Sequence, residues 1–153
     1  MKLLIQRVLS ASVTVGEEVV GRIGKGILCY FGVERTDESD ILHPFLDKLL
    51  KLRIFEDGEG KMNLNLSDAG GEILFVSQFT LTSDIYKGNR PGFETCKAPK
   101  EAEEIYNSAV NYLREKGYKV ETGLFGRAML VTSVNDGPCT FLLESQKIKS
   151  IGR

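Results

Sequence analysis

The order of extended and helical patterns along the chain restricts the fold most strongly. Many short β-rich runs surround only two helical segments. Apolar residues repeat every four positions from Ile41 to Leu50, which predicts a helix that starts near Asp40 and keeps Pro44 in its first turn. A second helix is predicted from Pro99 to a stop at Gly117. Because these helices do not alternate regularly with the strands, the sequence predicts the α+β class with a largely antiparallel or mixed sheet.

The β-rich runs differ in pattern. Residues 12–15 and 19–23 flank Gly16, which predicts a hairpin. Residues 27–33 form a continuous apolar run, which predicts a buried strand with Cys29 as a small core residue. The remaining predicted strands are residues 2–8, 62–67, 72–77 and 119–123. Residues 83–96 lack apolar periodicity and predict a long loop, a kind of segment that often carries function.

The segment Asn135-Asp136-Gly137-Pro138 lies between two further strand-like runs, residues 128–134 and 140–144. Asn, Asp, Gly and Pro are turn-forming residues, so the simplest interpretation is a hairpin loop. A second interpretation is that Gly137 and Pro138 present bare backbone carbonyls to a ligand, because glycine has no side chain to block its approach. Local sequence alone leaves both interpretations open.

Composition excludes several classes of protein. The chain has 153 residues, which suits a single domain spanning residues 1–153 with a substantial core. No apolar run approaches the roughly 18 residues of a transmembrane helix, and the first residues lack a signal-peptide pattern. We therefore expect a cytoplasmic protein with no membrane association. The net charge of −1 argues against a long nucleic-acid footprint.

Metal and triad chemistry are poorly supported. The cysteines, Cys29, Cys96 and Cys139, are scattered and odd in number, so they predict neither a disulfide framework nor a metal-binding pair. His43 is the only histidine, and beside Pro44 in a predicted helix it is expected to face solvent. A Ser-His-Asp or Cys-His mechanism is therefore not favoured, and we expect no metal and no cofactor.

Several separated motifs resemble one known family in the same order. They are Ile5-Gln6-Arg7-Val8, residues 52–57, Ser77-Gln78-Phe79-Thr80-Leu81, residues 87–91, and Asn135-Asp136-Gly137-Pro138-Cys139-Thr140. Together they resemble the D-aminoacyl-tRNA deacylases, the D-Tyr-tRNA deacylase family, over about residues 1–146. Two departures stand out. Cys139 replaces the usual Val, and Gly126-Arg127-Ala128-Met129 replaces the usual Gly-Ala-Asp-Met.

The resemblance implies a curved, barrel-like sheet and a homodimer. It implies hydrolysis of the ester that joins a D-amino acid to the acceptor end of tRNA. It also implies a cis Gly137-Pro138 bond that excludes L-amino acids, so that glycine would be accepted as well. A non-catalytic RNA- or protein-binding dimer with the same pocket is the alternative function.

The segment Ser77-Gln78-Phe79-Thr80 admits two chemical interpretations. Ser77 or Thr80 would be a nucleophile only with a base beside it, and neither Asp84 nor His43 is well placed in the sequence. Alternatively, the backbone N–H groups of Phe79 and Thr80 form an oxyanion hole, while Ser77 and Gln78 shape the pocket. A neighbouring ribose hydroxyl of the tRNA would then assist the attacking water.

Five further residues are candidates for support or tRNA contact. Arg7, at a strand end, is expected either to hold carbonyls of the Gly-Pro segment or to be an ordinary exposed arginine. Lys87, Asn89 and Arg90 lie in the long loop, where the charges either meet phosphates or are simply solvated. Met129 is expected to line an adenine pocket or to belong to the core.

Overall fold

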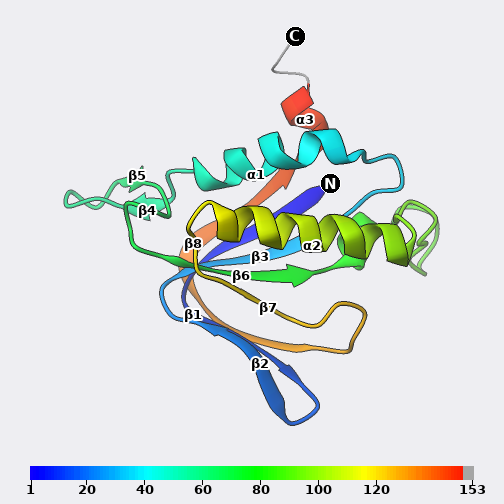
Figure 1. The fold of residues 1–153 in the computed structure, drawn as a ribbon, viewed down its shortest axis with the longest axis horizontal. Helices are drawn as coiled ribbons and strands as arrows, with labels where there is room; N and C mark the ends of the chain where they lie inside the picture. Colours follow the sequence, from blue (N-terminus) through cyan, green and yellow to red (C-terminus); the bar gives the residue numbers. More distant parts are fainter. Residues whose placement is uncertain (150–153) are drawn as a thin grey trace.

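The computed structural model describes residues 1–149. Its main sheet has the order β2-β1-β3-β6-β7, with β8 paired to the other side of β1 (Figure 1). The strands are β1 (Lys2–Val15), β2 (Glu18–Ile23), β3 (Gly26–Gly32), β6 (Glu72–Ser77), β7 (Val120–Thr122) and β8 (Leu130–Glu144). A small second sheet pairs β4 (Phe55–Glu56) with β5 (Met62–Leu64). The predicted α+β class with a mixed sheet is confirmed.

The sheet is antiparallel on one side and parallel on the other. β1 runs antiparallel to β2, β3 and β8, whereas β3, β6 and β7 are mutually parallel. The parallel pairs need crossover connections, and these contain the two long helices. The sheet curves until its two ends, β2 and β7, lie against each other. A Cβ at Gly21 of β2 would collide with the Thr122 carbonyl of β7, so this close approach depends on glycine.

The helices lie together over one face of the sheet (Figure 1). They are α1 (Leu42–Leu50), preceded by a 3₁₀ turn (Ser39–Ile41), and α2 (Pro99–Glu115). Pro44 is in the first turn of α1, and Gly117 follows α2 with a φ of 88°, as the sequence predicts. The short helix α3 (Ser145–Lys149) was not predicted.

Continuous apolar strands supply two separate cores. Cys29, Ile73 and Phe75 face the helices and belong to the larger cluster. Leu28 and Leu74 alternate with them and face the smaller cluster, which fills the inside of the curved sheet. Because successive side chains of a strand point to opposite faces, β3 and β6 must be apolar at every position to serve both cores.

The hairpin interpretation of residues 135–138 is wrong. Both flanking runs belong to the single strand β8, and both pair with β1. Gln6 pairs with Thr140 and Val8 with Asn135, so the four residues from Asp136 to Cys139 lie opposite Arg7 alone. The turn-forming residues therefore make a large bulge within one strand. The local sequence of residues 128–134 and 140–144 does not show that both runs pair with the same strand, β1.

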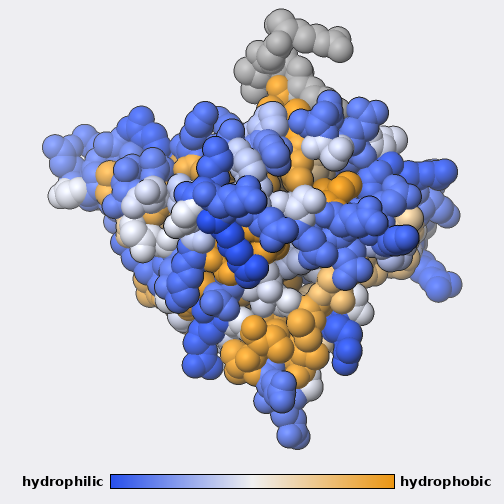
Figure 2. Space-filling view, in the orientation of Figure 1, coloured by the Kyte–Doolittle hydropathy of each residue, from blue (hydrophilic) through white to orange (hydrophobic). Residues whose placement is uncertain are grey.

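The molecular surface is mostly polar, with one apolar patch at the lower end, over β2 and the start of β8 (Figure 2). Val19 and Leu130 are among the exposed apolar side chains, and Leu130 is 72% exposed. No helix within residues 1–149 is long and apolar enough to cross a membrane.

Candidate active site

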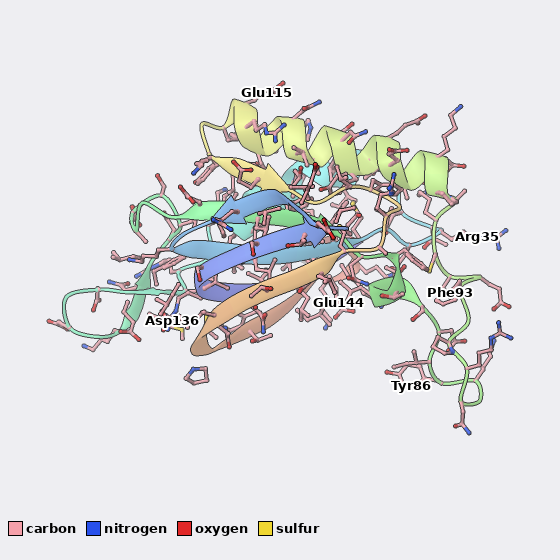
Figure 3. The ribbon with its side chains drawn as sticks, turned by 90° about the horizontal axis from the view of Figure 1, so that it is seen from below. Arg35, Tyr86, Phe93, Glu115, Asp136 and Glu144 are labelled. Carbon is pink, nitrogen blue, oxygen red and sulfur yellow. The ribbon has the colours of Figure 1, made fainter. Side chains whose placement is uncertain are left out.

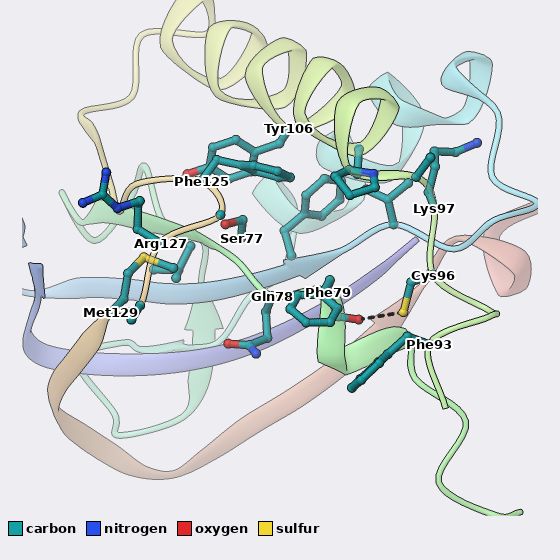
Figure 4. A pocket seen from close by; sticks show the side chains of 18 of the residues that line it. Ser77, Gln78, Phe79, Phe93, Cys96, Lys97, Tyr106, Phe125, Arg127 and Met129 are labelled. Atoms are coloured by element: carbon teal, nitrogen blue, oxygen red, sulfur yellow. Dashed lines mark hydrogen bonds between the residues drawn. The ribbon is translucent and has the colours of Figure 1, made fainter. Parts of the chain in front are cut away.

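A pocket of about 720 Å³ opens where the parallel strands β3 and β6 end (Figure 4). The carboxyl ends of parallel strands are a common position for ligand sites. Its wall comes from these two strand ends, the start of α2, residues 93–98 and residues 125–129. Pockets of this size commonly hold small-molecule ligands.

Tyr106 and Phe125 line one wall of the pocket, and the buried Phe75 lies behind Tyr106. The Tyr106 ring stacks on Phe75 and also contacts Phe125, with centroid distances of 5.7 and 5.8 Å. The Tyr106 hydroxyl donates to the Phe75 carbonyl at 2.7 Å. Burial raises the pKa of Tyr106, so this hydroxyl stays protonated and is no general base. The wall is therefore a fixed apolar surface.

The strand β6 ends in a 3₁₀ turn, η2 (Phe79–Thr82), at the edge of the pocket. The Leu81 N–H donates to the Gln78 carbonyl at 3.2 Å and is the first to close this turn. Phe79 and Thr80 precede that bond, so their N–H groups lie in the part of the turn that has no internal acceptors. The geometry thus offers two adjacent backbone donors, those of Phe79, which lines the pocket, and of Thr80, the next residue.

The polar side chains of this segment have no base beside them. Within the described residues, the Ser77 hydroxyl makes no hydrogen bond, although Ser77 points into the pocket (Figure 4). The Thr80 hydroxyl accepts a short hydrogen bond from the Gln78 amide. Asp84 instead accepts the Tyr86 N–H at 3.0 Å. His43 is exposed on α1 and stacks on Tyr112, as expected of a solvent-facing helix residue.

Two residues at the end of the long loop, Thr95 and Cys96, hold η2 through hydrogen bonds. The Cys96 thiol donates to the Phe79 carbonyl at 3.4 Å and accepts from the Thr82 hydroxyl at 3.3 Å. The Thr95 hydroxyl donates to the Thr82 carbonyl at 2.5 Å. These bonds hold the carbonyl groups of η2 and do not use the N–H groups of Phe79 and Thr80.

A separate polar cluster holds the bulge of β8. Arg7 is 3% exposed and lies within β1, so the expectation of an exposed arginine at a strand end is wrong. Its side chain donates to the carbonyl of Asp136 at 3.1 Å and to that of Ile54 at 2.7 Å. The Asn135 amide donates to the carbonyls of Arg7 and Cys139 at 2.9 and 3.3 Å. The predicted bonding of Arg7 to this segment is therefore observed, at the carbonyl that precedes Gly137.

The bulge presents its tip to solvent. Gly137 and Pro138 are exposed, and the peptide bond between them is cis, as the resemblance implies. Cys139 is buried, which suits the small apolar residue usual at this position. Neither Gly137 nor Pro138 lines the pocket in the same chain. Asp136 and Phe93, which mark the bulge and the pocket edge, lie at opposite sides of the molecule (Figure 3).

The remaining candidates divide between the pocket and the long loop. Met129 lines the pocket and also packs against the smaller core. Lys87, Asn89 and Arg90 are exposed on the loop and do not line the pocket. The Lys87 ammonium lies 3.8 Å from the Asp84 carboxylate.

Sequence reasoning missed much of the pocket wall. The missed residues include Phe93, Cys96, Lys97, Tyr106, Phe125 and Arg127. They come from three segments that no local pattern connects. One signal was present: Phe93 is an apolar residue in a loop rich in Gly and Pro, where burial in a core is not expected. Within residues 1–149, no group of three or more His, Cys, Asp or Glu side chains is placed to hold a metal ion.

The fold and the site together define an α+β protein with a nearly closed mixed sheet and a ligand pocket at the ends of parallel strands. A family model described as D-Tyr-tRNA(Tyr) deacylase matches residues 4–144. The chain therefore belongs to the D-Tyr-tRNA deacylase family.

Curated relatives agree with this assignment, and solved structures share the fold. A D-aminoacyl-tRNA deacylase from Desulfitobacterium hafniense is 54% identical over 96% of this chain and 99% of its own. One from Clostridioides difficile is 48% identical with the same coverage. A solved structure described as c-Myc DNA unwinding element binding protein superposes with a TM-score of 0.88 at 43% identity, covering 94% of this chain and 98% of that one. A probable eukaryotic D-amino acid tRNA deacylase shares the fold, with a TM-score of 0.77, 20% identity and coverage of 93% and 97%.

Proposed function

We propose that this protein is a chiral proofreading hydrolase that cleaves the ester bond of D-aminoacyl-tRNA in the cytoplasm and releases free D-amino acid and tRNA. The observation that carries the proposal is the pair of leading N–H groups of η2, those of Phe79 and Thr80, which have no acceptor within the turn and adjoin a pocket of about 720 Å³. Family membership supplies the substrate class.

In this proposal the backbone stabilises the developing negative charge. When water attacks the ester carbonyl, its oxygen becomes an oxyanion that accepts hydrogen bonds from Phe79 and Thr80. In other enzymes, removing one preorganised donor of this kind lowers transition-state stabilisation by about 3 kcal/mol. Because the donors are backbone N–H groups, this stabilisation requires no catalytic base or metal on the protein. The hydrogen bond from Cys96 to the Phe79 carbonyl holds the turn that carries them.

The tRNA itself completes the chemistry. The ester is attached to the terminal ribose, whose neighbouring hydroxyl is held beside the carbonyl. That hydroxyl polarises the attacking water with the advantage of an intramolecular group. Ser77 and Gln78 shape the pocket around the reacting carbonyl, and Tyr106, Phe125 and Met129 provide apolar wall for the adenine.

We further propose that the site is completed by a second copy of the chain. Gly137 and Pro138 are exposed but lie away from their own pocket, so they reach a Ser77–Thr80 segment only in a two-fold dimer. Exposed apolar residues on β8, among them Leu130 and Leu142, suit such an interface. Sedimentation should give a dimer at micromolar concentration, and a fully active monomer would contradict the proposal.

In the dimer, the Gly137-Pro138 backbone rejects L-amino acids by occupying the space of the L side chain. Exclusion of this kind does not depend on which side chain is offered. Many D-aminoacyl-tRNAs should therefore be hydrolysed, and glycine, for example mischarged on tRNA-Ala, should be hydrolysed too. An enzyme that cleaves D-Tyr-tRNA but leaves Gly-tRNA intact at high enzyme concentration would indicate another route of selection.

RNA contact is proposed to be confined to the acceptor end, with Lys87, Asn89 and Arg90 of the long loop nearest the phosphates. With a net charge of −1, few phosphates are neutralised. The slope of log K against log salt should then be shallow, about −0.9 for each duplex phosphate contacted. A slope as steep as that of a large repressor would contradict a local footprint.

The deciding experiment is incubation with D-Tyr-tRNA and L-Tyr-tRNA. Release of the D-amino acid alone establishes the proposed activity. The alternative is a non-catalytic RNA- or protein-binding dimer. A similar solved structure is described as a DNA unwinding element binding protein, a description that names binding and no hydrolysis. Tight binding of both aminoacyl-tRNAs without hydrolysis would establish that alternative.

A further inference from the structure

The long loop carries aromatic side chains that the fold does not use. Tyr86 is 92% exposed and Phe93 is 49% exposed. Phe93 packs edge-on against Phe79 with a centroid distance of 5.3 Å, so it belongs to the rim of the pocket. Tyr86 lies farther out on the same loop, and Figure 3 shows it extending from the same edge of the molecule as Phe93 and Arg35. An aromatic ring this exposed adds little to the core.

The backbone that presents Tyr86 is well defined. Asp84 and Gly92 form an isolated antiparallel bridge, with hydrogen bonds of 2.8 and 2.9 Å in the two directions. The Asp84 carboxylate accepts the Tyr86 N–H, and Gly88 turns the chain with a φ of 76°. The loop is thus a closed unit that displays residues 85–91 beside the pocket.

The charges around this unit favour an anionic partner. Arg90 on the loop and Arg35 at its base make no ion pair among the described residues, whereas Lys87 pairs with Asp84. The Thr95 carbonyl accepts the Arg35 N–H at 2.8 Å, which fixes Arg35 beside the end of the loop. Lys97 is paired with Glu101, and the nearby acids are Glu94 on the loop, Asp84, which pairs with Lys87, and Glu34, which pairs with Lys2. Aromatic faces interleaved with free arginines are typical of surfaces that bind single-stranded nucleic acid.

We propose that this surface receives the unpaired nucleotides that precede the terminal, aminoacylated one, with Tyr86 stacking on a base and Arg35 contacting a phosphate. The inference rests on the proposed deacylase function, because that function places the terminal nucleoside in the adjoining pocket. The strand that leaves the pocket past the Phe79–Phe93 rim then meets Tyr86 next. Unpaired bases expose both faces, so they suit an exposed tyrosine in a way that duplex RNA does not.

The test compares a full substrate with a truncated one. Deacylation kinetics are measured on D-Tyr-tRNA and on the D-tyrosyl ester of adenosine, which lacks the preceding nucleotides. Tyr86→Ala should raise KM for the tRNA about tenfold, the loss expected for one stacked base, with kcat unchanged. It should leave the adenosine ester unaffected. Tyr86→Phe, which keeps the ring, should behave as the unchanged protein does.

Two further variants separate stacking from charge. Arg35→Ala should raise KM for tRNA a few-fold and reduce the magnitude of the salt slope by about one. Lys61→Ala removes an exposed charge from the loop between β4 and β5, at the opposite end of the molecule, and should change neither substrate (Figure 1).

Three outcomes would overturn the inference. Tyr86→Ala with an unchanged KM for tRNA would show that the ring is not used. An equal rise in the KM of Tyr86→Ala for both substrates would place Tyr86 in the pocket itself. A change in the sedimentation of Tyr86→Ala would assign the loop to the contact between copies. If the unchanged protein hydrolyses neither substrate, the proposed function fails and this inference fails with it.

Discussion

Two buried cations hold this molecule together in different ways. Arg7 is buried within β1, and its side chain contacts Asp136 of the exposed bulge. Its Nε donates to the Asp136 carbonyl and lies 2.9 Å from an oxygen of the partly exposed Asp136 carboxylate. The ammonium group of Met1 is enclosed by buried partners, the carboxylate of Asp37 and the hydroxyl of Ser145, the latter at 2.7 Å. One cation therefore fixes a surface segment, whereas the other joins β1, the segment after β3 and α3.

The comparison teaches that burial of a charge does not by itself reveal its purpose. All members of the Met1 cluster are buried, so its loss should lower the unfolding free energy without changing activity. The Arg7 cluster ends at Gly137 and Pro138, so its loss should affect stability and the proposed selection of substrates.

The largest effect is expected from Arg7→Ala. The buried carbonyl of Ile54 and that of Asp136 lose their donor, and unsatisfied acceptors of this kind together cost about 3 kcal/mol of unfolding free energy. Denaturant unfolding measures this loss, and deacylation per folded molecule should fall as well. Arg7→Lys is the matched control: it keeps the charge but not the planar group that reaches two carbonyls, so an intermediate loss is expected. Unchanged deacylation by folded Arg7→Ala would show that the hydrogen bonds of Arg7 to the bulge are not needed for activity.

Asp37→Asn should have the next largest effect. The Met1 ammonium loses its carboxylate partner, and a hydrogen bond to a charged group contributes about 2 kcal/mol. Ser145 also donates to Asp37 at 3.2 Å, so the whole cluster loosens. Deacylation per folded molecule should stay at the level of the unchanged protein. A variant that is stable but inactive would show that the two clusters are not separate.

A smaller effect concerns pH. Burial lowers the pKa of the Met1 ammonium below its ordinary value of 8.0, against the opposing influence of Asp37 and Glu34. Between the folded pKa and 8.0 the unfolded chain binds more protons at this group, so the group's contribution to the unfolding free energy rises with pH in that window. Denaturant unfolding at several pH values measures this slope. In Asp37→Asn the pKa should fall further and the rise should begin at lower pH; a contribution that falls with pH would contradict this reasoning.

Thr80→Ala should have the smallest effect. The Thr80 side chain accepts a hydrogen bond from Gln78 and holds no backbone group, unlike Arg7. Alanine keeps the N–H group that the proposed mechanism uses, so deacylation should stay within about fivefold, a loss of roughly 1 kcal/mol. Single-turnover kinetics on D-Tyr-tRNA give the measurement. Complete loss of activity in a correctly folded variant would make Thr80 a nucleophile after all.

Elements with strong local signals were predictable from the sequence. The helix α2 was expected from Pro99 to Gly117 and runs from Pro99 to Glu115, because its start, apolar face and stop are all encoded locally. The Gly16 hairpin and the buried strands β3 and β6 were predicted for the same reason.

What failed depends on contacts between distant parts of the chain. The bulge looked like a hairpin because Asn135-Asp136-Gly137-Pro138 is turn chemistry, and only the shared pairing with β1 shows otherwise. The pocket wall likewise joins Phe93, Tyr106 and Phe125 from separate elements. The segment Ser77–Thr80 and Arg7 were singled out because a family resemblance supplied what local patterns lack.

The pairing of β1 with β8 has a consequence for the order of assembly during synthesis. Lys2 pairs with Glu144, so the first strand made waits for the last one before its outer edge is covered. At about 5–20 residues per second, a ribosome would leave that edge open for roughly 7–30 seconds. Open strand edges invite wrong pairing between chains. The bulge, which faces Arg7 across this late pairing, is then among the last parts of the molecule to form.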